Sequence, residues 1–549
     1  MYMKDKSMRK TGFVNGAFVV TLGIVITKIL GILYVIPFHS VIGDRGGALY
    51  GYAYTIYLFF ISISTAGIPL AISNIVSEYQ TLGYYNAKRR AFLIGRRIAL
   101  LLGVISFILL MVFAPILASM IIGDLSGGNS IDDVAFVIRV ISSAILVVPV
   151  LSIYRGYFEG HRFMIAPSIS QVLEQVVRIL VIILGSYLSL KVFKLSLSTT
   201  VGIAVFGATL GAISSFLYLF YKRIRNRSKF NERIRPVNEP IVTDKQILRK
   251  IIYYAIPFIM IDFFKSLYSC IDMVTVVKGL VNYAKFSTSD AEIIISMLST
   301  WGAKFNMIVI AISTGIIVSL IPNLTTSYVK EDAKDINKKI NQAINIILFL
   351  AIPMSIGISF LSKSIWTLFY GYSVYGPNVL SYSIFIGVFT ALFTSMISVI
   401  QVFKDYKSLL ISLSVGVVLK LLLNNSLISA FYKMGLPAYY GIISATIIGY
   451  FVSFIICLVV LRNKYNVSYE SVIKNFFDIL CASLLMVVGL SLVKFIIPIY
   501  SDVRVYNVFI ILAYSIVGMG IYFMYSYSTK LIDNVFGKGY MKKIFKKNK

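Results

Sequence analysis

Apolar segments of about 20 residues or more recur along this chain from one end to the other, and each could cross the ~30 Å hydrocarbon layer of a membrane as a helix. Of the 549 residues, 58% are hydrophobic and only 14% are charged, which is little charge for a soluble protein of this size. The sequence lacks the alternating segments of about ten residues that are typical of a transmembrane β-barrel. It therefore predicts an all-α polytopic membrane protein.

Lysine and arginine gather in alternate loops between these segments, most densely at residues 88–97, 222–250 and 530–549. Because cytoplasmic loops carry the excess of basic residues, this pattern predicts a multi-pass protein of the cell membrane with both termini in the cytoplasm. Such a topology needs an even number of spans, and we expect about fourteen, with twelve or sixteen still open. The expected spans are residues 14–38, 52–79, 92–122, 133–158, 166–190, 199–221, 251–277, 297–328, 341–369, 376–402, 408–432, 438–461, 473–499 and 505–527.

The charge balance and the cysteines limit the partners and cofactors. The net charge of +29 is better explained by basic loops that meet anionic membrane lipids than by nucleic acid binding. Cys270, Cys457 and Cys481 lie inside apolar segments, and no metal or disulfide pattern is visible. No GxxxxGK[ST] phosphate loop occurs, so no nucleotide or other cofactor is expected, and energy must come from an ion gradient, the membrane potential or substrate supply. No convincing pair of catalytic carboxylates occurs in the loops, so we do not expect an enzyme.

An internal repeat relates the two halves of the chain. Residues 63–79 (ISTAGIPLAISNIVSEY) align with residues 312–328 (ISTGIIVSLIPNLTTSY), and the short loops FEGHR (158–162) and FKDYK (403–407) also correspond. Six helices in each half give both halves the same membrane orientation, as in transporters built from parallel repeats. We expect two six-helix lobes related by a parallel pseudo-twofold axis and two additional C-terminal helices.

The expected domains follow from this repeat. They are an N-terminal lobe at residues 1–221, a basic cytoplasmic linker at 222–250, a C-terminal lobe at 251–461, and the last two helices with a basic cytoplasmic tail at 462–549.

Basic side chains lie near the middle of several apolar segments, at Lys28, Arg178, Lys265 and Lys420. A charge at the centre of a bilayer costs at least ~2.5–3.5 kcal/mol, so such residues usually face a polar cavity and serve a function. A largely cationic interior would suit an anionic cargo. Two alternatives stay open, because a lysine can extend to the lipid headgroups and because Lys265 has a carboxylate, Asp262, three residues before it.

The fifth expected helix carries Glu174 four residues before Arg178, which is the favourable order for an ion pair within one helix. The pair could be a self-neutralised seam between helices, or it could line a polar cavity in which the carboxylate titrates. Glu174 is therefore a candidate for ion or proton coupling. Lys304, in the outer half of the eighth expected span, is a further candidate for the cavity.

Three stretches resemble the MurJ-type lipid II flippases of Gram-positive bacteria and, more broadly, the polysaccharide-exporter branch that includes the stage V sporulation protein B group. They are TKILGILYVIPF at 27–38, ISTAGIPLAISNIVSEY at 63–79 and VIRVISSAILVVPVLSIYRGYFEGHRFMIAPSISQVLEQVVRIL at 137–180. The resemblance runs over essentially the whole chain and is more specific for the subfamily than for the cargo.

This resemblance implies a flippase that moves an undecaprenyl-diphosphate-linked cell-wall precursor, lipid II above all, from the inner to the outer leaflet by alternating access. Basic side chains would hold the diphosphate and sugar headgroup, and a groove formed with the last two helices would hold the lipid tail. It also implies a lipid-linked oligosaccharide as the substrate, and the cell-wall synthesis machinery is a candidate partner.

Individual positions follow from the resemblance. Lys28 in TKILG matches the basic position of the family's first helix, and Lys304 falls within about one residue of the basic position on its eighth helix. A second basic position on the first helix is Tyr34 in this chain, and the second helix lacks its basic residues. Phosphate contacts would therefore pass to other deep cations.

The remaining deep cations are Lys265, Arg178 and Lys420, which could take over those contacts. A sodium site described for some relatives needs acids on the seventh and eleventh helices. Asp262 could serve on the seventh, but the eleventh has none, which puts sodium coupling in doubt.

Several other functions remain open from the sequence. A flippase for another polyprenyl-linked repeat unit, of a capsule, teichuronic or sporulation polymer, would have the same features. A drug/cation antiporter of the same superfamily would favour an acidic, aromatic cavity. A membrane-embedded glycosyltransferase or polymerase would need acidic catalytic residues at a membrane face, and a purely structural scaffold also stays open.

Overall fold

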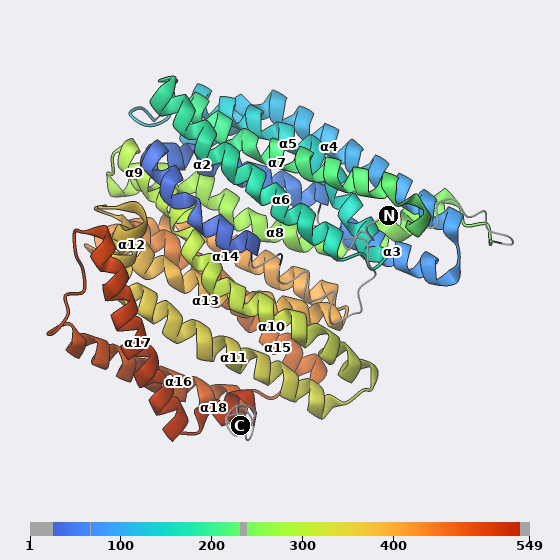
Figure 1. The fold of residues 1–549 in the computed structure, drawn as a ribbon. Helices are drawn as coiled ribbons and strands as arrows, with labels where there is room; N and C mark the ends of the chain where they lie inside the picture. The colour runs from blue at the N-terminus through green and yellow to red at the C-terminus, as the bar shows by residue number, and fades with distance from the viewer. Residues whose placement is uncertain (1–22, 24–25, 66, 124, 231–238, 538–549) are drawn as a thin grey trace, which may run out of the picture. The chain divides into compact units, whose positions relative to one another are not determined.

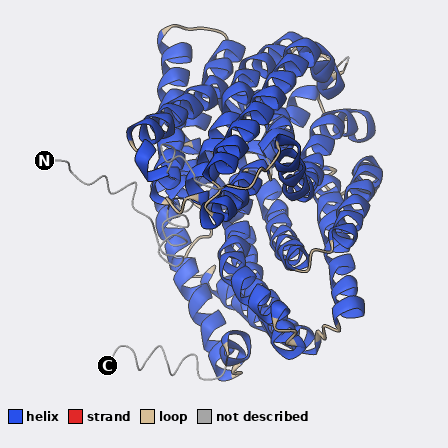
Figure 2. Cartoon of the chain, turned by 90° about the vertical axis from the view of Figure 1, so that its right-hand side faces the viewer, coloured by secondary structure: helices blue, strands red, loops and turns tan. Residues whose placement is uncertain are grey.

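The computed structural model describes residues 23, 26–65, 67–123, 125–230 and 239–537. These residues are almost entirely helical, contain no strand, and are joined by short loops (Figure 2). Twelve candidate membrane spans among them are long and apolar enough to cross a membrane. The expected all-α multi-pass membrane fold is confirmed. The basic residues at the N-terminus and those at residues 538–549 lie outside the described residues.

Two of the fourteen expected spans are not among these twelve. The first, at residues 14–38, lies largely outside the described residues. The seventh corresponds to α8 (Asp244–Ala284), a helix of 41 residues. Charged residues such as Asp262, Lys265 and Asp272 make its middle less apolar than the other spans. Fourteen therefore stays an approximate count.

Packing divides the chain into two compact units, one of residues 1–281 and 286–296 and the other of residues 282–285 and 297–549. This division groups α8 with the first unit, whereas the repeat assigns residues 251–461 to the second lobe. The two divisions rest on different criteria, packing and internal sequence similarity, so the repeat-based boundaries stay a prediction. The boundary at residues 296 and 297 falls inside one continuous candidate span, Thr288–Val329.

The first unit holds the helices up to α9. In it, α5 packs against both α4 and α7, and α6 packs against α7 (Figure 1). The bounds are α2 (Val35–Thr65), α3 (Ile68–Leu82), α4 (Tyr85–Ile122), α5 (Ile131–Gly160), α6 (Ile165–Leu180), the π-helices η2 (Val181–Gly185) and η3 (Leu188–Val192), α7 (Leu197–Arg225), the 3-10 helix η4 (Arg227–Phe230), α8 and α9 (Thr288–Ser296).

The second expected span is broken into α2 and α3. Gly67 precedes α3 with φ +71°, a left-handed conformation that favours glycine. Pro69 follows in the first turn of α3, where its missing N–H leaves no hydrogen bond unmade. A Cβ on Gly67 would lie 2.5 Å from the carbonyl oxygen of Ala255 on α8, so α3 and α8 meet at this glycine. The repeat-related residues 312–328 lie in one unbroken helix, so the two halves share sequence here but not the break.

In the second unit, α13 contacts α10, α11 and α15, while α14 runs along α15. The last two long helices, α16 and α17, contact each other, and α16 also lies against α11 (Figure 1). The bounds are the π-helix η5 (Met297–Trp301), α10 (Ala303–Val329), α11 (Ala333–Phe360), α12 (Ser362–Tyr370), α13 (Gly376–Val402), α14 (Tyr406–Lys433), α15 (Tyr439–Tyr465), α16 (Glu470–Val493), α17 (Arg504–Ser528) and α18 (Leu531–Phe536).

An aromatic cluster fixes the start of the basic linker to the end of α5. Phe230, at the end of η4, is fully buried. Its ring centroid lies 5.0–5.3 Å from the rings of Tyr157, Phe158, His161 and Phe163. The part of the linker that holds Phe230 is therefore packed onto the first unit.

Polar contacts fix the far end of the same linker. Glu239 accepts hydrogen bonds from the backbone N–H groups of Asn86 and Ala87, at 2.9 and 2.8 Å, in the first turn of α4. A carboxylate at a helix N-terminus satisfies N–H groups that have no partner within the helix.

We expect Phe230→Ala to release the start of the linker, because loss of a buried phenylalanine costs about 3–5 kcal/mol. In full-length protein in lipid nanodiscs, limited trypsin digestion should then cut faster after Arg227 and Lys229. Ile241→Ala, which changes a linker residue that is 93% exposed, is the matched control and should cut at the wild-type rate. Equal rates for all three proteins would mean that Phe230 does not anchor the linker.

Candidate functional site

A carboxylate shared by two arginines lies in the first unit, between α5 and α6. On α6, Glu174 Oε1 accepts a hydrogen bond from Arg178 Nη2 at 2.9 Å, and its Oε2 accepts one from Arg155 Nη2 of α5 at 2.8 Å. Arg155 Nε also donates to Ser170 Oγ at 3.0 Å. We call Arg155, Glu174 and Arg178 the arginine–glutamate cluster. Its side chains are 13–18% exposed, and it holds two cations for one anion.

Tyrosines of α2 lie around one of these guanidinium groups. Tyr54 Oη is 3.5 Å from Arg178 Nη1, and Tyr50 and Tyr57 are near enough to interact with Arg178 electrostatically. The rings of Tyr50 and Tyr54 stack with centroids 5.6 Å apart. The Nε atom of Arg178 is buried and has no hydrogen-bond acceptor among the described residues. Arg178 thus has more donor capacity than the surrounding side chains use.

Two glycines of α7 set the position of α6. A Cβ on Gly211 would lie 2.7 Å from the backbone oxygen of Glu174, and a Cβ on Gly207 would lie 3.1 Å from that of Arg178. The two helices therefore meet backbone to backbone at the level of the cluster. This contact fixes where the Glu174 and Arg178 side chains begin.

Lys28 lies beside the same helix. It belongs to the helical residues 26–33 and is partly buried. The nearby Gly23 and Gly31 face α6, since a Cβ on each would lie 3.2 Å from Ser168 and 3.7 Å from Gln175, respectively. Of the predicted site residues, the structure thus brings Glu174 and Arg178 into contact and places Lys28 next to the helix that carries them.

Lys265 and Asp262 lie together on α8, also in the first unit. Lys265 Nζ is 3.9 Å from Asp262 Oδ1, and the two side chains are 33% and 51% exposed. The local pair that the sequence left open as an alternative is present. This pair does not exclude contact with a ligand, because both groups remain accessible.

The second unit holds the other two predicted cations on separate helices. Lys420 is fully buried on α14 and donates a hydrogen bond to Thr446 Oγ1 of α15. Lys304 is partly buried at the start of α10, directly after η5. A role for Lys420 in a cavity wall stays a prediction, since its side chain is enclosed between two helices in this structure.

Arg178 and Lys420 occupy equivalent places in the internal repeat. Each lies sixteen residues after a left-handed residue in the preceding loop, Arg162 with φ +63° and Lys404 with φ +57°. The equivalent cations have different partners, since Arg178 meets a carboxylate and Lys420 meets a hydroxyl.

The sequence reasoning misses Arg155, because the apolar segment 133–158 ends close to it. In the structure α5 continues to Gly160, so Arg155, which was expected close to the helix end, lies about 8 Å along the axis from it. Residues 158–160 (FEG), which were expected to begin a short loop, continue as helix. A basic residue one or two turns inside a helix end is a signal that could have found it.

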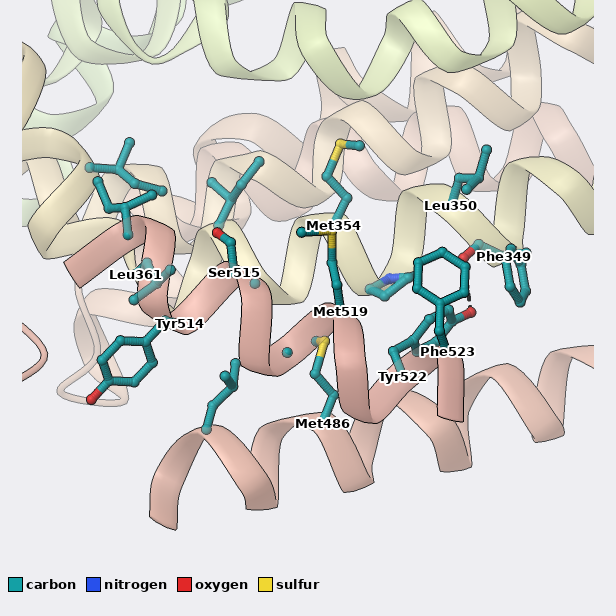
Figure 3. A pocket seen from close by; sticks show the side chains of 17 residues that line it. Phe349, Leu350, Met354, Leu361, Met486, Tyr514, Ser515, Met519, Tyr522 and Phe523 are labelled. Carbon is teal, nitrogen blue, oxygen red and sulfur yellow. Dashed lines mark hydrogen bonds between the residues drawn. The ribbon is translucent and has the colours of Figure 1, made fainter. Parts of the chain in front are cut away.

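An apolar cavity of about 370 Å³ lies in the second unit, between α11, α12, α16 and α17 (Figure 3). Three methionines, Met354, Met486 and Met519, line it from three different helices (Figure 3). Methionine side chains are flexible and adapt to irregular apolar ligands. Met519 is 53% exposed, so the cavity is open on its α17 side.

The tyrosines of this cavity present their rings to it. Tyr522 Oη donates to the Phe349 carbonyl at 2.9 Å, and Tyr514 Oη donates to the Ile497 carbonyl at 2.7 Å. Because backbone oxygens satisfy both hydroxyls, the lining is almost wholly apolar. Leu350 borders this cavity and also a second one of about 550 Å³ between α10 and α11, so the two hollows adjoin at this residue of α11.

These features define a helical membrane protein of two helical units, with basic side chains inside both units and an apolar cavity at its last two long helices. Residues 13–322 match the model of the family described as polysaccharide biosynthesis protein. The lipid II flippase MurJ of Bacillus subtilis (strain 168) is 32% identical over 535 residues, which cover 95% of this chain and 96% of the relative. The chain therefore belongs to the polysaccharide biosynthesis protein family and is a relative of MurJ, and the resemblance inferred from the sequence is confirmed.

Solved structures agree on the fold. A lipid II flippase MurJ in an inward closed conformation superposes with a TM-score of 0.65 at 16% identity, over 94% of this chain and 100% of that one. An inward-facing multidrug resistance transporter of the MATE family matches with a TM-score of 0.64 at 14% identity, over 81% and 98%. The relatives are named as a flippase and a transporter, in agreement with the expectation that this chain is not an enzyme.

We expect Gly211→Ala to push α6 away from α7, because the added methyl group would lie 2.7 Å from a backbone oxygen. Overpacking of this kind costs about 1–3 kcal/mol. The melting temperature of the purified protein in detergent should fall more for Gly211→Ala than for Gly207→Ala. The methyl group added at Gly207 would lie 3.1 Å from the backbone oxygen of Arg178, which is a less severe contact. Equal melting temperatures for wild type and both variants would contradict the close contact.

Proposed function

We propose that this chain is a flippase that moves an undecaprenyl-diphosphate-linked cell-wall precursor, lipid II, from the inner to the outer leaflet of the cell membrane. The observation that carries the proposal is the 32% identity to the lipid II flippase MurJ of Bacillus subtilis over 95% of this chain and 96% of the relative. So complete a match leaves little of either protein without a counterpart.

Basic side chains would hold the diphosphate and the sugar headgroup. Charge-assisted hydrogen bonds to phosphate are about twice as strong as neutral ones, and cations inside a membrane are rare without such a role. The first unit would supply Lys28, Arg178 and Lys265, and the second would supply Lys304 and Lys420. Glu174 and Asp262 stay the candidates for ion or proton coupling.

The apolar cavity at α11, α12, α16 and α17 would hold the lipid tail. Its lining is apolar, its methionines are adaptable, and it is open on one side. Each buried CH₂ group of a tail contributes about 0.8 kcal/mol. The tail could thus stay in an apolar environment while the headgroup moves.

The mechanism we propose is alternating access of two six-helix lobes, with both termini in the cytoplasm. A membrane potential that is negative inside draws a cationic empty site inward and exerts little force on a site neutralised by its cargo, so the potential would drive the return step without cargo. The cell-wall synthesis machinery would supply the cargo and use it on the other face.

Two alternative functions can be distinguished from lipid II flipping by the experiments described below. A flippase for another polyprenyl-linked repeat unit would use the same cations and the same cavity. A drug/cation antiporter of the same superfamily would favour an acidic, aromatic cavity, although a MATE transporter has a similar fold. The deep charges described in this chain are mainly basic, which favours an anionic cargo.

A rescue experiment tests the cargo. In cells depleted of their own lipid II flippase, wild type should restore lipid II to the outer leaflet, and Lys28→Ala and Lys304→Ala at matched membrane levels should lose most of it, because each removes one cation from the headgroup path. The measurement is lipid II accessible to a membrane-impermeant probe. If well-expressed wild type restores nothing, another polyprenyl-linked polymer becomes the leading cargo.

A substitution that fills the apolar cavity tests the tail site. A Cβ on Gly357 of α11 would meet no atom within 4 Å, so Gly357→Ala should transport like wild type. Gly357→Leu should fill the space and lower lipid II exposure several-fold, because the tail would lose its apolar site. The same accessibility assay measures both variants. If Gly357→Leu exposes as much lipid II as wild type, the lipid tail does not bind in this cavity.

A further inference from the structure

The arginine–glutamate cluster holds more positive charge and more hydrogen-bond donors than its structural contacts require. One glutamate is enough to neutralise one arginine, but Glu174 lies between two guanidinium groups from different helices. Each guanidinium is a planar group with five N–H donors. The Nε of Arg178 is buried and finds no acceptor among the described residues. An anion with more charge and more oxygens than a carboxylate would satisfy this cluster better.

The side chains of the cluster differ in how many groups outside the cluster hold them in place. Arg155 is positioned by Ser170, whose hydroxyl in turn donates to the Pro167 carbonyl at 2.7 Å. Arg178 has Tyr54 beside it. The carboxylate of Glu174, by contrast, has no hydrogen-bond donors among the described residues other than the two arginines. The arginines can therefore keep their places when Glu174 turns away.

We propose that Arg155 and Arg178 form a binding site for a diphosphate group, and that Glu174 occupies this site as an internal competitor until the diphosphate displaces it. A phosphate group offers several strong acceptor oxygens in the geometry that arginine pairs with best. Displacement avoids leaving two cations unpaired at membrane depth, which would be costly for the empty protein. Only the identity of the diphosphate as lipid-linked cargo rests on the proposed flippase function.

Competition would also make the site reversible. A bare pair of arginines would bind a diphosphate tightly and release it slowly. Because Glu174 returns to the arginines when the diphosphate leaves, the competitor weakens binding and favours release. Arg155 thereby joins Arg178 as a residue that contacts the ligand.

Equilibrium binding to full-length protein in lipid nanodiscs tests this proposal, with inorganic pyrophosphate and farnesyl diphosphate as the probes. Glu174→Gln keeps the shape of the side chain but removes its charge, and it should bind both probes about tenfold more tightly than wild type, a gain of about 1.4 kcal/mol. Arg155→Gln and Arg178→Gln should lose at least tenfold in affinity. If Glu174→Gln gains affinity only for farnesyl diphosphate, the site binds lipid-linked ligands. If it gains affinity only for pyrophosphate, the site binds free anions.

Glu159→Gln is the matched control. Glu159 lies one turn beyond Arg155 on α5 and interacts with it electrostatically, but no hydrogen bond joins them in the structure. Measured at alkaline pH, where both carboxyl groups are ionised, a general effect of removing one negative charge would give Glu159→Gln the same gain in affinity as Glu174→Gln, and that result would overturn the competitor role. Unchanged affinity in Glu174→Gln, or no binding of either probe by any variant, would overturn it as well.

A second variant keeps the proposal testable if Glu174→Gln folds poorly. Glu174→Asp keeps the charge but is one methylene shorter and should not reach both arginines, so its affinity should lie between those of wild type and Glu174→Gln. We expect Glu174→Asp to bind the diphosphate probes more tightly than wild type and to melt at a lower temperature. A lower melting temperature with unchanged binding would mean that the cluster only holds the helices together. Lipid II exposure in cells tests the flippase function separately, so either proposal can fail alone.

Discussion

The cost of placing charge in a medium that does not solvate it governs the interior of this protein. Water is absent from the hydrocarbon layer, so each deep cation needs a partner supplied by the protein or by a ligand. Three solutions are visible: Arg155 and Arg178 share a carboxylate, Lys265 has a loose pair with Asp262, and Lys420 is enclosed against Thr446. They differ in accessibility, and that difference separates groups that could meet cargo from groups that join helices.

Much of the fold could be predicted from the sequence because hydrocarbon selects apolar residues so strongly. The expected span 376–402 coincides with α13, Gly376–Val402. Helix ends in polar surroundings were harder: α4 begins at Tyr85, while the apolar run begins near residue 92, because polar helical turns carry no hydropathy signal. The break at Gly67 has a local signal in Gly67 and Pro69, but the close approach of α8 to this glycine is not contained in a local pattern.

The candidate site divides in the same way. The contact between Glu174 and Arg178 follows from their spacing on one helix. The contact between Glu174 and Arg155 joins two helices, so it depends on how α5 and α6 pack, and spacing alone does not reveal it. The apolar cavity was expected only through the family resemblance, because its lining comes from four helices and consists of residues that are common in any membrane span.

The boundary between the two packing units has a mechanical consequence. The last passage of the chain from the first unit to the second is at residues 296 and 297, within a helical span where a loop would be the usual connection. There the α-helical ladder gives way to the wider turn of η5, Met297–Trp301, in which hydrogen bonds close larger rings. A helix transmits torque that a flexible loop would dissipate. A change in the winding of η5 would therefore turn the residues that follow it, including Lys304 near the start of α10.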